Sequence, residues 1–547
     1  MHQKILILGS STKASVYVTK QLKKYGLHVT VVDWSDTPVK FSKYIDQFIL
    51  LSSPIYNVES FMNDFTDLLK KNKFDCLLPI HDPAIEICKK YRGQIGSYCK
   101  VIGINDDPVQ AYASDKSVLY NLASEIGISI PKGRLINTIQ DLDMYLGQLA
   151  YPVVIKPIQS AVLKDNRIYQ FKVKITNNEN EVIDFVRENI NNVPLLLQEY
   201  IEGYGIGYNI FAVNGKICNA YIHRRINEHG GISSYRESLP TNTYDLQLPA
   251  AELIKKIGWN GVAMIEFKIH NNIPFLMEMN GRFWGSIEVA IKSGLNYPVM
   301  LYESEFLHKV VACDMPIRMV KVRNLKDEIV LYADKLINKG KGREFAKWTW
   351  SVIKCIFRKD NFIEDNFFDN PAFVSATYFY ELKRIIKKLS SRLKKRFIKI
   401  PYRKPNFKTG TQYSIAFACS GNICRSPFAQ KYAEKINTTY KFSSYGTSLY
   451  NNRLSPLNAI KAALAFNIDL STFQSKSVDI SKLNKFDFIF IFDKKNYFDL
   501  KKLGADENKI FFLSDKEIDD PYGKDEKAFG NQYALIRSRI DQLFSAN

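Results

Sequence analysis

The 547-residue sequence has none of the patterns typical of secreted or membrane-spanning proteins. Its eight cysteines are scattered without a CxxC pair, which argues against a disulfide framework and against a structural zinc site. No apolar run approaches the roughly 18 residues that a membrane-spanning helix needs. Residues 1–11 are typical of a first strand entering a turn and not of a signal peptide, so we expect a cytoplasmic location.

Low-complexity tracts and obvious internal repeats are also missing. Hydrophobic residues make up 46% and charged residues 24% of the chain, which is an ordinary globular composition. At roughly 100 to 200 residues per domain, the length predicts three or four domains. Gly9 follows the first strand without the full glycine triplet of a dinucleotide fingerprint, so we predict no nicotinamide or flavin cofactor.

Acidic residues are scarce in one part of the chain. The formal net charge is +20, and residues 318–408 contain 24 Lys and Arg against 9 Asp and Glu. Most of the positive charge is therefore local. Within this part, apolar residues recur at three- and four-residue spacing from Leu382 to Phe397, which predicts an amphipathic basic helix. Such a helix suits the surface of an anionic membrane, with the tryptophans of residues 347–358 nearby as anchors. Packing against the rest of the chain is the main alternative, and we do not expect nucleic acid as a partner.

The first 310 residues contain two successive α/β patterns. Residues 3–35 predict strand, turn, helix and strand, and further apolar strands follow to about residue 104, so we expect one α/β domain over 1–112. A second domain is predicted over 113–310, beginning with a capped helix at Asp115 and Lys116. A basic, mainly helical connecting region is predicted over 311–408, and a last α/β domain over 409–547.

The segment PFLMEMNGRFWG, residues 274–285, places charged and amide side chains at alternate positions of a strand. Glu278, Asn280 and Arg282 are therefore predicted on one face. A turn at residues 271–272 would pair this strand with residues 262–268, so that Glu266 faces Glu278. Two carboxylates and an amide oxygen are suitable ligands for Mg²⁺. The alternative is a strand pair with a surface salt bridge between Glu278 and Arg282.

Two other strands of this domain carry polar residues in apolar surroundings. In residues 151–157 a single cation, Lys156, ends a buried strand, which favours burial against an anion. Residues 195–203 begin with an apolar strand, which is followed by Glu199, Tyr200, Ile201 and Glu202. A backbone of this kind can lie along a flat purine ring while a carboxylate reaches a ribose.

Five features of this part follow one another in an order that resembles the ATP-grasp superfamily. They are Asp115 with Lys116, the strand ending at Lys156, the segment around Glu199, the Ile-Glu-Phe at Glu266 and the segment from Glu278 to Arg282. The resemblance covers about residues 1–310. It implies ATP-dependent activation of a carboxylate as an acyl phosphate, followed by attack of an amine or another nucleophile. The residue roles that it implies are Lys116 and Lys156 for ATP phosphates, Glu199, Tyr200 and Ile201 for adenine, Glu202 for ribose, Glu266, Glu278 and Asn280 for Mg²⁺ (with Mn²⁺ as an alternative), and Arg282 for the transferring phosphate.

One departure from the family pattern concerns the loop that covers the phosphates. The family usually has a glycine-rich loop there, whereas residues 157–167 contain no glycine. Either another loop closes the site or turnover is weak. Downstream, Arg225 and Arg236 are candidates for holding the acceptor carboxylate, and a solvated basic face is the alternative.

The C-terminal part contains the most specific motif. A buried strand over 413–418 leads into Cys419, a tight loop, then Arg425, Ser426 and Pro427 at the start of a helix. Strand, loop and helix N-terminus form a cradle for an anion, because backbone N–H groups and the helix dipole converge there. Cys419 is expected to react as a thiolate, and Arg425 to grip a phosphate with two hydrogen bonds.

With residues 444–447 and 519–523, this loop resembles the low-molecular-weight protein tyrosine phosphatases over about 411–545. The resemblance implies Cys419 as nucleophile of a phosphocysteine, Arg425 as clamp of the transition state and Asp520 as general acid. Ser426 is expected to donate to the sulfur, and the resemblance implies that Asn422 and Ser444 brace the loop. Cys424 is close enough in sequence for a reversible disulfide with Cys419.

From these patterns we expect an α/β protein, a bifunctional ATP-grasp ligase and tyrosine phosphatase. Its predicted partners are a phosphotyrosine protein or a small phosphorylated substrate, small carboxylates and amines, and a peripheral contact with the inner face of an anionic membrane. The fusion suggests a role in bacterial envelope polysaccharide metabolism. Two alternatives remain: a phosphatase regulated by a non-catalytic, nucleotide-sensing ATP-grasp module, and a phosphatase that the basic region tethers to a membrane.

Overall fold

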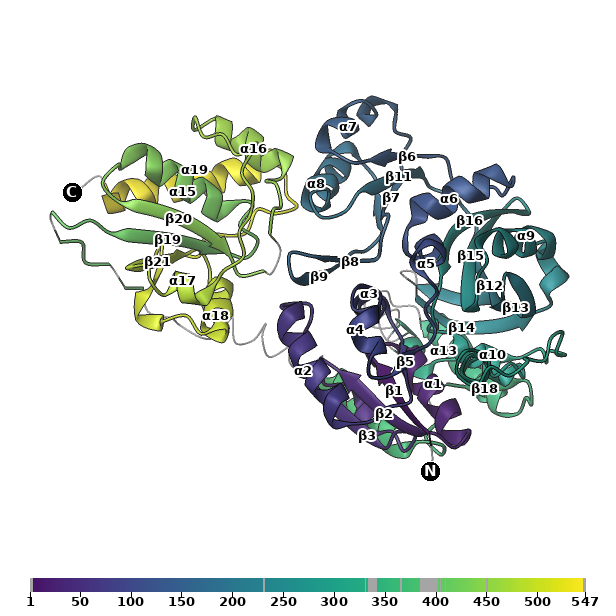
Figure 1. The fold of residues 1–547 in the computed structure, drawn as a ribbon. Coiled ribbons are helices and arrows are strands. Elements are labelled where there is room, and N and C mark those ends of the chain that lie inside the picture. Colours follow the sequence, from purple (N-terminus) through teal and green to yellow (C-terminus); the bar gives the residue numbers. More distant parts are fainter. Residues whose placement is uncertain are drawn as a thin grey trace. The chain divides into compact units, whose positions relative to one another are not determined.

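The computed structural model describes residues 3–229, 232–329, 331–332, 342–364, 366–383, 402–403, 405–408, 410–448 and 451–544. The chain divides into two compact units. The first contains residues 1–134, 157–173 and 198–384, and the second contains residues 135–156, 174–197 and 385–547. Figure 1 shows the elements of both units, and each unit is described by itself.

The first unit opens with a five-stranded parallel sheet in the order β3-β2-β1-β4-β5. Residues alternate along β1, so that Ile5 and Ile7 face one apolar core while Leu6 and Leu8 face another. The predicted α/β opening is therefore confirmed. The strands are β1 Lys4–Leu8, β2 His28–Asp33, β3 Gln47–Leu50, β4 Cys76–Pro79 and β5 Lys100–Val101, and the helices are α1 Lys13–Lys24, α2 Val58–Lys71, α3 Asp82–Lys90, α4 Arg92–Gly96, α5 Asp107–Ser114 and α6 Lys116–Glu125.

The second sheet of this unit has seven strands in the order β16-β15-β12-β13-β14-β17-β18. Its central strands are antiparallel, and a two-stranded hairpin, β8 and β9, belongs to the same unit. The elements are β8 Ala161–Lys164, β9 Arg167–Gln170, β12 Tyr204–Val213, β13 Lys216–His229, β14 Ile232–Leu239, α9 Gln247–Ile257, β15 Gly261–His270, β16 Ile273–Asn280, α10 Ile287–Lys292, α11 Tyr297–Leu301, β17 Lys321–Arg323, α13 Gly342–Ile356 and β18 Asn361–Ile363.

The connecting region, expected to be mainly helical over 311–408, contributes β17 and β18 to this sheet. β17 pairs antiparallel with β14, and β18 pairs parallel with β17. Helix α13 and a helix over residues 371–383 supply the described helical part. Most of the predicted basic helix from Leu382 to Phe397 lies outside the described residues.

The second unit contains two sheets. The first has the strand order β10-β7-β11-β6, and the second is parallel with the order β20-β19-β21-β22. The parallel sheet has an apolar core on each face, as expected for a doubly wound domain. The elements are β6 Gly133–Ile136, α7 Ile139–Asp143, β7 Val153–Pro157, β10 Lys174–Thr176, α8 Glu179–Asn189, β11 Leu195–Glu199, β19 Ser414–Cys419, α15 Arg425–Ile436, β20 Lys441–Gly446, α16 Leu457–Leu464, α17 Ile480–Leu483, β21 Phe488–Ile491, α18 Lys494–Leu503, β22 Ile510–Phe512 and α19 Glu526–Phe544.

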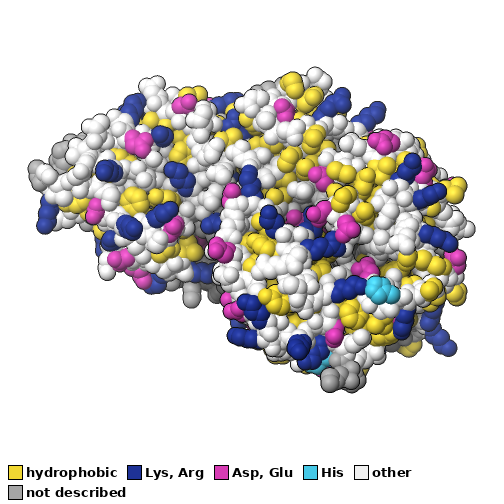
Figure 2. Space-filling view, in the orientation of Figure 1, with side chains coloured by type: hydrophobic (Ala, Val, Ile, Leu, Met, Phe, Trp, Pro, Cys, Tyr) yellow, Lys and Arg dark blue, Asp and Glu magenta, His cyan; other side chains and the backbone are white. Residues whose placement is uncertain are grey.

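The surface carries positive charge over a wide area. Figure 2 shows Lys and Arg side chains spread across the face that it draws, with fewer Asp and Glu side chains among them. In the part of the chain that the structure describes, no helix has both the length and the apolar character that crossing a membrane requires.

Candidate active sites

The first candidate site lies at the carboxyl end of β19, where the strand stops at Cys419 and α15 begins at Arg425. The Cys419 side chain is buried, and its sulfur is the centre of a small hydrogen-bond cluster. The backbone N–H of Asn422 donates to Sγ at 3.2 Å, and the hydroxyl of Ser426 lies 3.0 Å from it. Both groups stabilise a thiolate, and they stand at the positive end of the helix dipole.

Asn422 holds the shape of this loop from its buried position. Its Nδ2 donates to the hydroxyls of Ser426 and Ser444, each at 2.9 Å, and its Oδ1 accepts from the backbone N–H of Lys476 at 2.8 Å. The backbone of Asn422 is left-handed with φ of 52°, a conformation that Asn adopts at lower cost than most residues. Asn422 thus links the nucleophile loop to β20 and to the segment that contains Lys476.

Arg425 is 1% exposed and lies between acidic side chains. Its NH1 donates to Asp493 Oδ2 at 2.6 Å and to the Ile518 carbonyl at 2.8 Å, and its NH2 forms an ion pair with Asp520 Oδ2 at 2.9 Å. Burial by itself lowers the pKa of Arg425, but the neighbouring Cys419, Asp520 and Asp493 raise it by more. The pKa therefore lies above its usual value, and the guanidinium stays charged.

One hydrogen-bond donor of this guanidinium has no acceptor within the described part of the chain, which indicates a place for a ligand. Among the described residues, Arg425 Nε is buried and has no acceptor. A buried N–H without an acceptor is costly, and a phosphate oxygen would satisfy it. Arg425 is therefore suited to hold an anion beside Cys419, as the C-x5-R spacing predicts.

Asp493 was not identified from the sequence. It caps α18 through the backbone N–H of Asn496 at 2.8 Å and accepts from Arg425 with its other oxygen. It follows β21 by two residues. Its place just beyond the carboxyl end of a parallel strand is the signal that could have suggested it.

The cavity around the nucleophile has a volume of about 180 Å³ and is lined by Cys419, Ser420, Gly421, Ile423, Cys424, Ser448, Arg453, Asp520 and Tyr522. The predicted general acid, Asp520, lies on its wall, and its side chain is 42% exposed. Tyr522 is also exposed and gives this wall of the cavity an aromatic surface. Cys419 and Cys424 are both free thiols, and burial raises the pKa of Cys424 well above its usual value.

The second candidate site lies on the β15–β16 hairpin of the first unit. Asn271 and Asn272 form its turn with φ of 48° and 62°, as the sequence predicts. The register pairs Glu266 with Glu278 and Met264 with Asn280. The expected facing of the two carboxylates is therefore confirmed, and Asn280 Nδ2 donates to Glu278 Oε1 at 3.1 Å.

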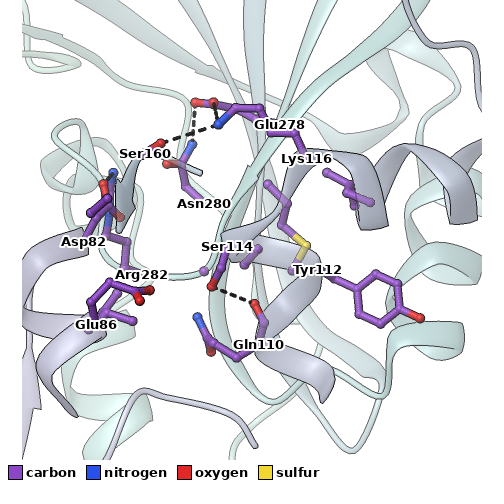
Figure 3. A pocket seen from close by; sticks show the side chains of 16 residues that line it. Asp82, Glu86, Gln110, Tyr112, Ser114, Lys116, Ser160, Glu278, Asn280 and Arg282 are labelled. Carbon is purple, nitrogen blue, oxygen red and sulfur yellow. Dashed lines mark hydrogen bonds and ion pairs between the residues drawn. The ribbon is translucent and has the colours of Figure 1, made fainter. Parts of the chain in front are cut away.

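Lys116 brings a cation to this face. It starts α6, is largely buried, and its Nζ lies 3.6 Å from Glu278 Oε2 and 3.4 Å from Ser160 Oγ. Figure 3 shows these side chains, together with Asn280, on the wall of one pocket. The pocket thus combines carboxylate, amide and ammonium groups from α6, β16 and the loop before β8.

Arg282 forms an ion pair with Asp82, a residue that was not predicted from the sequence. Arg282 Nε donates to Asp82 Oδ1 at 2.5 Å, and NH2 donates to Oδ2 at 2.9 Å. Burial favours the neutral acid, but Arg282 lowers the pKa of Asp82 below its usual value. This pair replaces the alternative salt bridge between Arg282 and Glu278. Asp82 follows β4 at the carboxyl end of the parallel sheet, where ligands often bind.

The two arginines proposed for an acceptor carboxylate have other partners. Arg225 forms ion pairs with Glu266 and Glu228. Arg236 is buried against Glu364, another buried side chain. Arg236 therefore belongs to a buried ion pair and is not open to an anion. The prediction that Arg236 holds an acceptor carboxylate is wrong.

The predicted nucleoside segment lies at the end of β11. Glu199 exchanges hydrogen bonds with the backbone of Lys132: its N–H donates to the Lys132 carbonyl at 2.9 Å, and its Oε1 accepts from the Lys132 N–H at 2.8 Å. Lys268 Nζ lies over the ring of Tyr200, 4.3 Å from the ring centre. Ile201 is half-buried and Glu202 is exposed. Lys156, the second predicted phosphate ligand, is buried in β7.

The glycine-free segment forms the β8–β9 hairpin. Asp165 and Asn166 provide the left-handed turn that glycine often provides, with φ of 51° and 58°. The tip is attached to the start of α2, because the Asn166 carbonyl accepts from the Val58 N–H at 2.9 Å and its Oδ1 accepts from the Glu59 N–H at 2.9 Å. The absence of glycine therefore does not prevent an ordered hairpin.

Strands β15 and β16 carry side chains of the chemical type that Mg²⁺ binds. Glu266, Glu278 and Asn280 offer hard oxygen donors, and nucleotide phosphates and water commonly complete such a shell. Among the described residues, no group of three or more His, Cys, Asp or Glu side chains is placed to hold a metal by itself. The donor set thus fits a Mg²⁺ that is bound together with a nucleotide.

Comparisons with known proteins match the two sites separately. Residues 414–546 match the family model for low molecular weight phosphotyrosine protein phosphatase, and residues 191–328 match a model for an ATP-grasp in the biosynthetic pathway with Ter operon. A Klebsiella pneumoniae protein named as a low molecular weight protein-tyrosine-phosphatase is 28% identical over 129 residues, which cover 22% of this chain and 89% of that protein.

Other relatives match the first part of the chain. An uncharacterized protein of Methanocaldococcus jannaschii is 23% identical over 313 residues, 56% of this chain and 75% of that protein. The carbamoyl phosphate synthase large chain of Sulfolobus acidocaldarius is 20% identical, and the match covers 46% of this chain and 25% of that protein. A solved L-amino acid ligase from Bacillus licheniformis aligns with a TM-score of 0.47 and 14% identity, over 58% of this chain and 79% of its own.

Proposed function

We propose that this chain, which joins an ATP-grasp domain to a low molecular weight phosphotyrosine phosphatase domain, catalyses two reactions. In the first, the C-terminal domain hydrolyses a phosphate monoester of tyrosine. The Cys419 thiolate attacks phosphorus, Arg425 holds the phosphoryl oxygens, and Asp520 gives a proton to the leaving phenol. Water then cleaves the phosphocysteine and releases phosphate.

The arrangement around the Cys419 sulfur carries this proposal. Two donors stabilise the thiolate, and the unsatisfied Arg425 Nε stands ready for a phosphate oxygen. Before it can act as an acid, Asp520 has to leave its ion pair with Arg425, and the binding of a dianionic phosphate to Arg425 would supply the replacement.

The test is the hydrolysis of phosphotyrosine and of p-nitrophenyl phosphate. Cys419→Ser should abolish both activities. Asp520→Asn should slow phosphotyrosine hydrolysis at least about tenfold more than p-nitrophenyl phosphate hydrolysis, because nitrophenolate leaves without a proton. Equal losses for both substrates would remove Asp520 from the role of general acid.

The second proposed reaction is an ATP- and Mg²⁺-dependent ligation of a carboxylate to an amine or related nucleophile, through an acyl phosphate. Lys116 and Lys156 would hold phosphates, and Glu199, Tyr200, Ile201 and Glu202 would hold the nucleoside. Glu266, Glu278 and Asn280 would hold Mg²⁺ or Mn²⁺, which lowers the negative charge that the phosphates present to a nucleophile. Arg282, oriented by Asp82, would stabilise the transferring phosphoryl group.

The cross-strand pair of Glu266 and Glu278, with Lys116 beside it, carries this second proposal. The test is substrate-dependent release of ADP with panels of carboxylates and amino acids. Glu278→Gln should remove the release. Glu252→Gln, an exposed change on α9 of the same unit, is the matched control and should leave it unchanged.

A regulatory role for the ATP-grasp domain is the second candidate. It is favoured by the glycine-free hairpin, whose tip is attached to α2. In that case ATP would bind without turnover, and its binding would change phosphatase kcat/KM. We propose the joined activities for bacterial envelope polysaccharide metabolism, with a phosphotyrosine protein as the phosphatase substrate. Loss of surface polysaccharide in a strain carrying Cys419→Ser or Glu278→Gln would support that setting, and unchanged polysaccharide would contradict it.

A further inference from the structure

Helix α13 has two opposite faces of different character. Trp348, Ser351 and Cys355 face the protein: Trp348 Nε1 donates to Glu328 at 2.9 Å, Ser351 Oγ accepts from Arg323 NH1 at 3.1 Å, and Cys355 is buried. The spacing of these residues is three and four, so they occupy one side of the helix. This side already has its partners.

The opposite side is apolar and exposed. Trp350 is 58% exposed, Ile353 41% and, just beyond the end of the helix, Phe357 82%. These residues also follow the three- and four-residue spacing, and the direction they share is opposite to that of Trp348, Ser351 and Cys355. Together they form an outward apolar stripe, here defined as Trp350, Ile353 and Phe357.

Basic side chains border this stripe. Arg343, Lys347, Lys354 and Arg358 are all exposed and fall along one flank of it. Lys354 Nζ lies over the Trp350 ring, 5.4 Å from its centre, so a positive charge stands directly beside the apolar surface of the stripe. The one acidic residue within the helix, Glu344, falls on the side that faces the protein.

We infer that the outward apolar stripe of α13 binds the surface of a membrane that contains anionic phospholipids. Trp and Phe favour the boundary between headgroups and acyl chains, and flanking Lys and Arg favour anionic headgroups. A convex helical stripe with cations along its flank is suited to a flat lipid surface with its headgroup charge. This contact goes beyond the two proposed reactions and does not depend on either.

The test uses the full-length protein with vesicles of phosphatidylcholine alone and vesicles with about 30% phosphatidylglycerol. We expect co-flotation with the anionic vesicles, and weaker binding as salt increases. The triple variant Trp350→Ser, Ile353→Ser, Phe357→Ser should reduce the partition coefficient about 100-fold, because three partly buried apolar side chains no longer enter the bilayer. Since these side chains are exposed, the fold should persist, which circular dichroism checks.

The control removes exposed apolar surface elsewhere in the same unit. Leu248 and Val310 are 83% and 99% exposed, and Leu248→Ser with Val310→Ser should leave vesicle binding unchanged. Three results would overturn the inference: no binding to anionic vesicles, equal binding by the stripe variant and the wild type, or a stripe variant whose only change is loss of self-association in light scattering. The last result would assign the stripe to a second copy of the chain.

Discussion

Asn422 offers the sharpest test of the phosphatase site, because it contacts the phosphate cradle without reacting. Replacing it with Ala removes the hydrogen bonds to Ser426 and Ser444 and leaves the Lys476 N–H without its acceptor. Each lost hydrogen bond between neutral groups costs about 1 kcal/mol, and three such bonds are lost. The left-handed backbone adds about 1 kcal/mol for Ala.

The total is therefore about 4 kcal/mol, and we expect about 3 kcal/mol of it to appear in the transition state, since the loop must be ordered there. This corresponds to a fall of about 100-fold in kcat/KM for phosphotyrosine. The assay is steady-state hydrolysis by purified, folded Asn422→Ala protein, beside Asn422→Gly. Gly adopts the same backbone conformation freely but makes none of the side-chain hydrogen bonds.

If the hydrogen bonds dominate, the Ala and Gly variants should lose similar activity. An Asn422→Gly enzyme close to wild type would show that the backbone conformation alone matters. A folded Asn422→Ala enzyme with unchanged kcat/KM would refute the reasoning entirely.

Three further predictions concern the acidic residues Asp493, Asp82 and Glu288. Asp493→Asn should lower kcat/KM for phosphotyrosine about 10- to 100-fold, because Arg425 loses a charged partner that orients it; unchanged kinetics would contradict this. Asp82→Asn should lower the rate of ADP formation about tenfold with little change in nucleotide affinity, because Arg282 loses its fork; a loss of affinity alone would oppose that role. Burial raises the pKa of Glu288 from 4.5 to about 7, so its contribution to stability is full below about pH 4.5 and is lost as the pH rises through 7. As the pH rises from 5 to 8, the free energy of unfolding of the wild type should therefore fall by about 2–3 kcal/mol relative to that of Glu288→Gln. A parallel pH dependence of the two proteins would contradict this. Tryptophan fluorescence reports selectively on the unfolding of the first unit, which contains Glu288, because all five tryptophans belong to that unit.

Local patterns predicted the parts of both sites that lie close together in sequence. Asn271 and Asn272 favour a left-handed two-residue turn, and this turn fixes the register that brings Glu266 opposite Glu278. In the same way, the interval from Cys419 to Arg425 fits a loop at a helix N-terminus. In each case a few consecutive residues determine the geometry.

Partners distant in sequence could not be predicted in this way. Asp82 reaches Arg282 across 200 positions, and Asp493 reaches Arg425 across 68. Arg236 has the same local features as an exposed basic residue, and only the buried Glu364 shows that its charge is already paired. The strands β17 and β18 are three residues each, too short for an alternating pattern to identify them.

The central claim is that one chain carries two separate chemistries, and the most direct measurement assays both reactions on the same two variants. ADP release with carboxylate and amino acid panels, and phosphotyrosine hydrolysis, are measured for Cys419→Ser and for Glu278→Ala. We predict that Cys419→Ser keeps substrate-dependent ADP release and loses hydrolysis, while Glu278→Ala shows the reverse. If Cys419→Ser binds ATP but releases no ADP across a broad panel, the ligase proposal is contradicted, and the ATP-grasp domain is a nucleotide-sensing module.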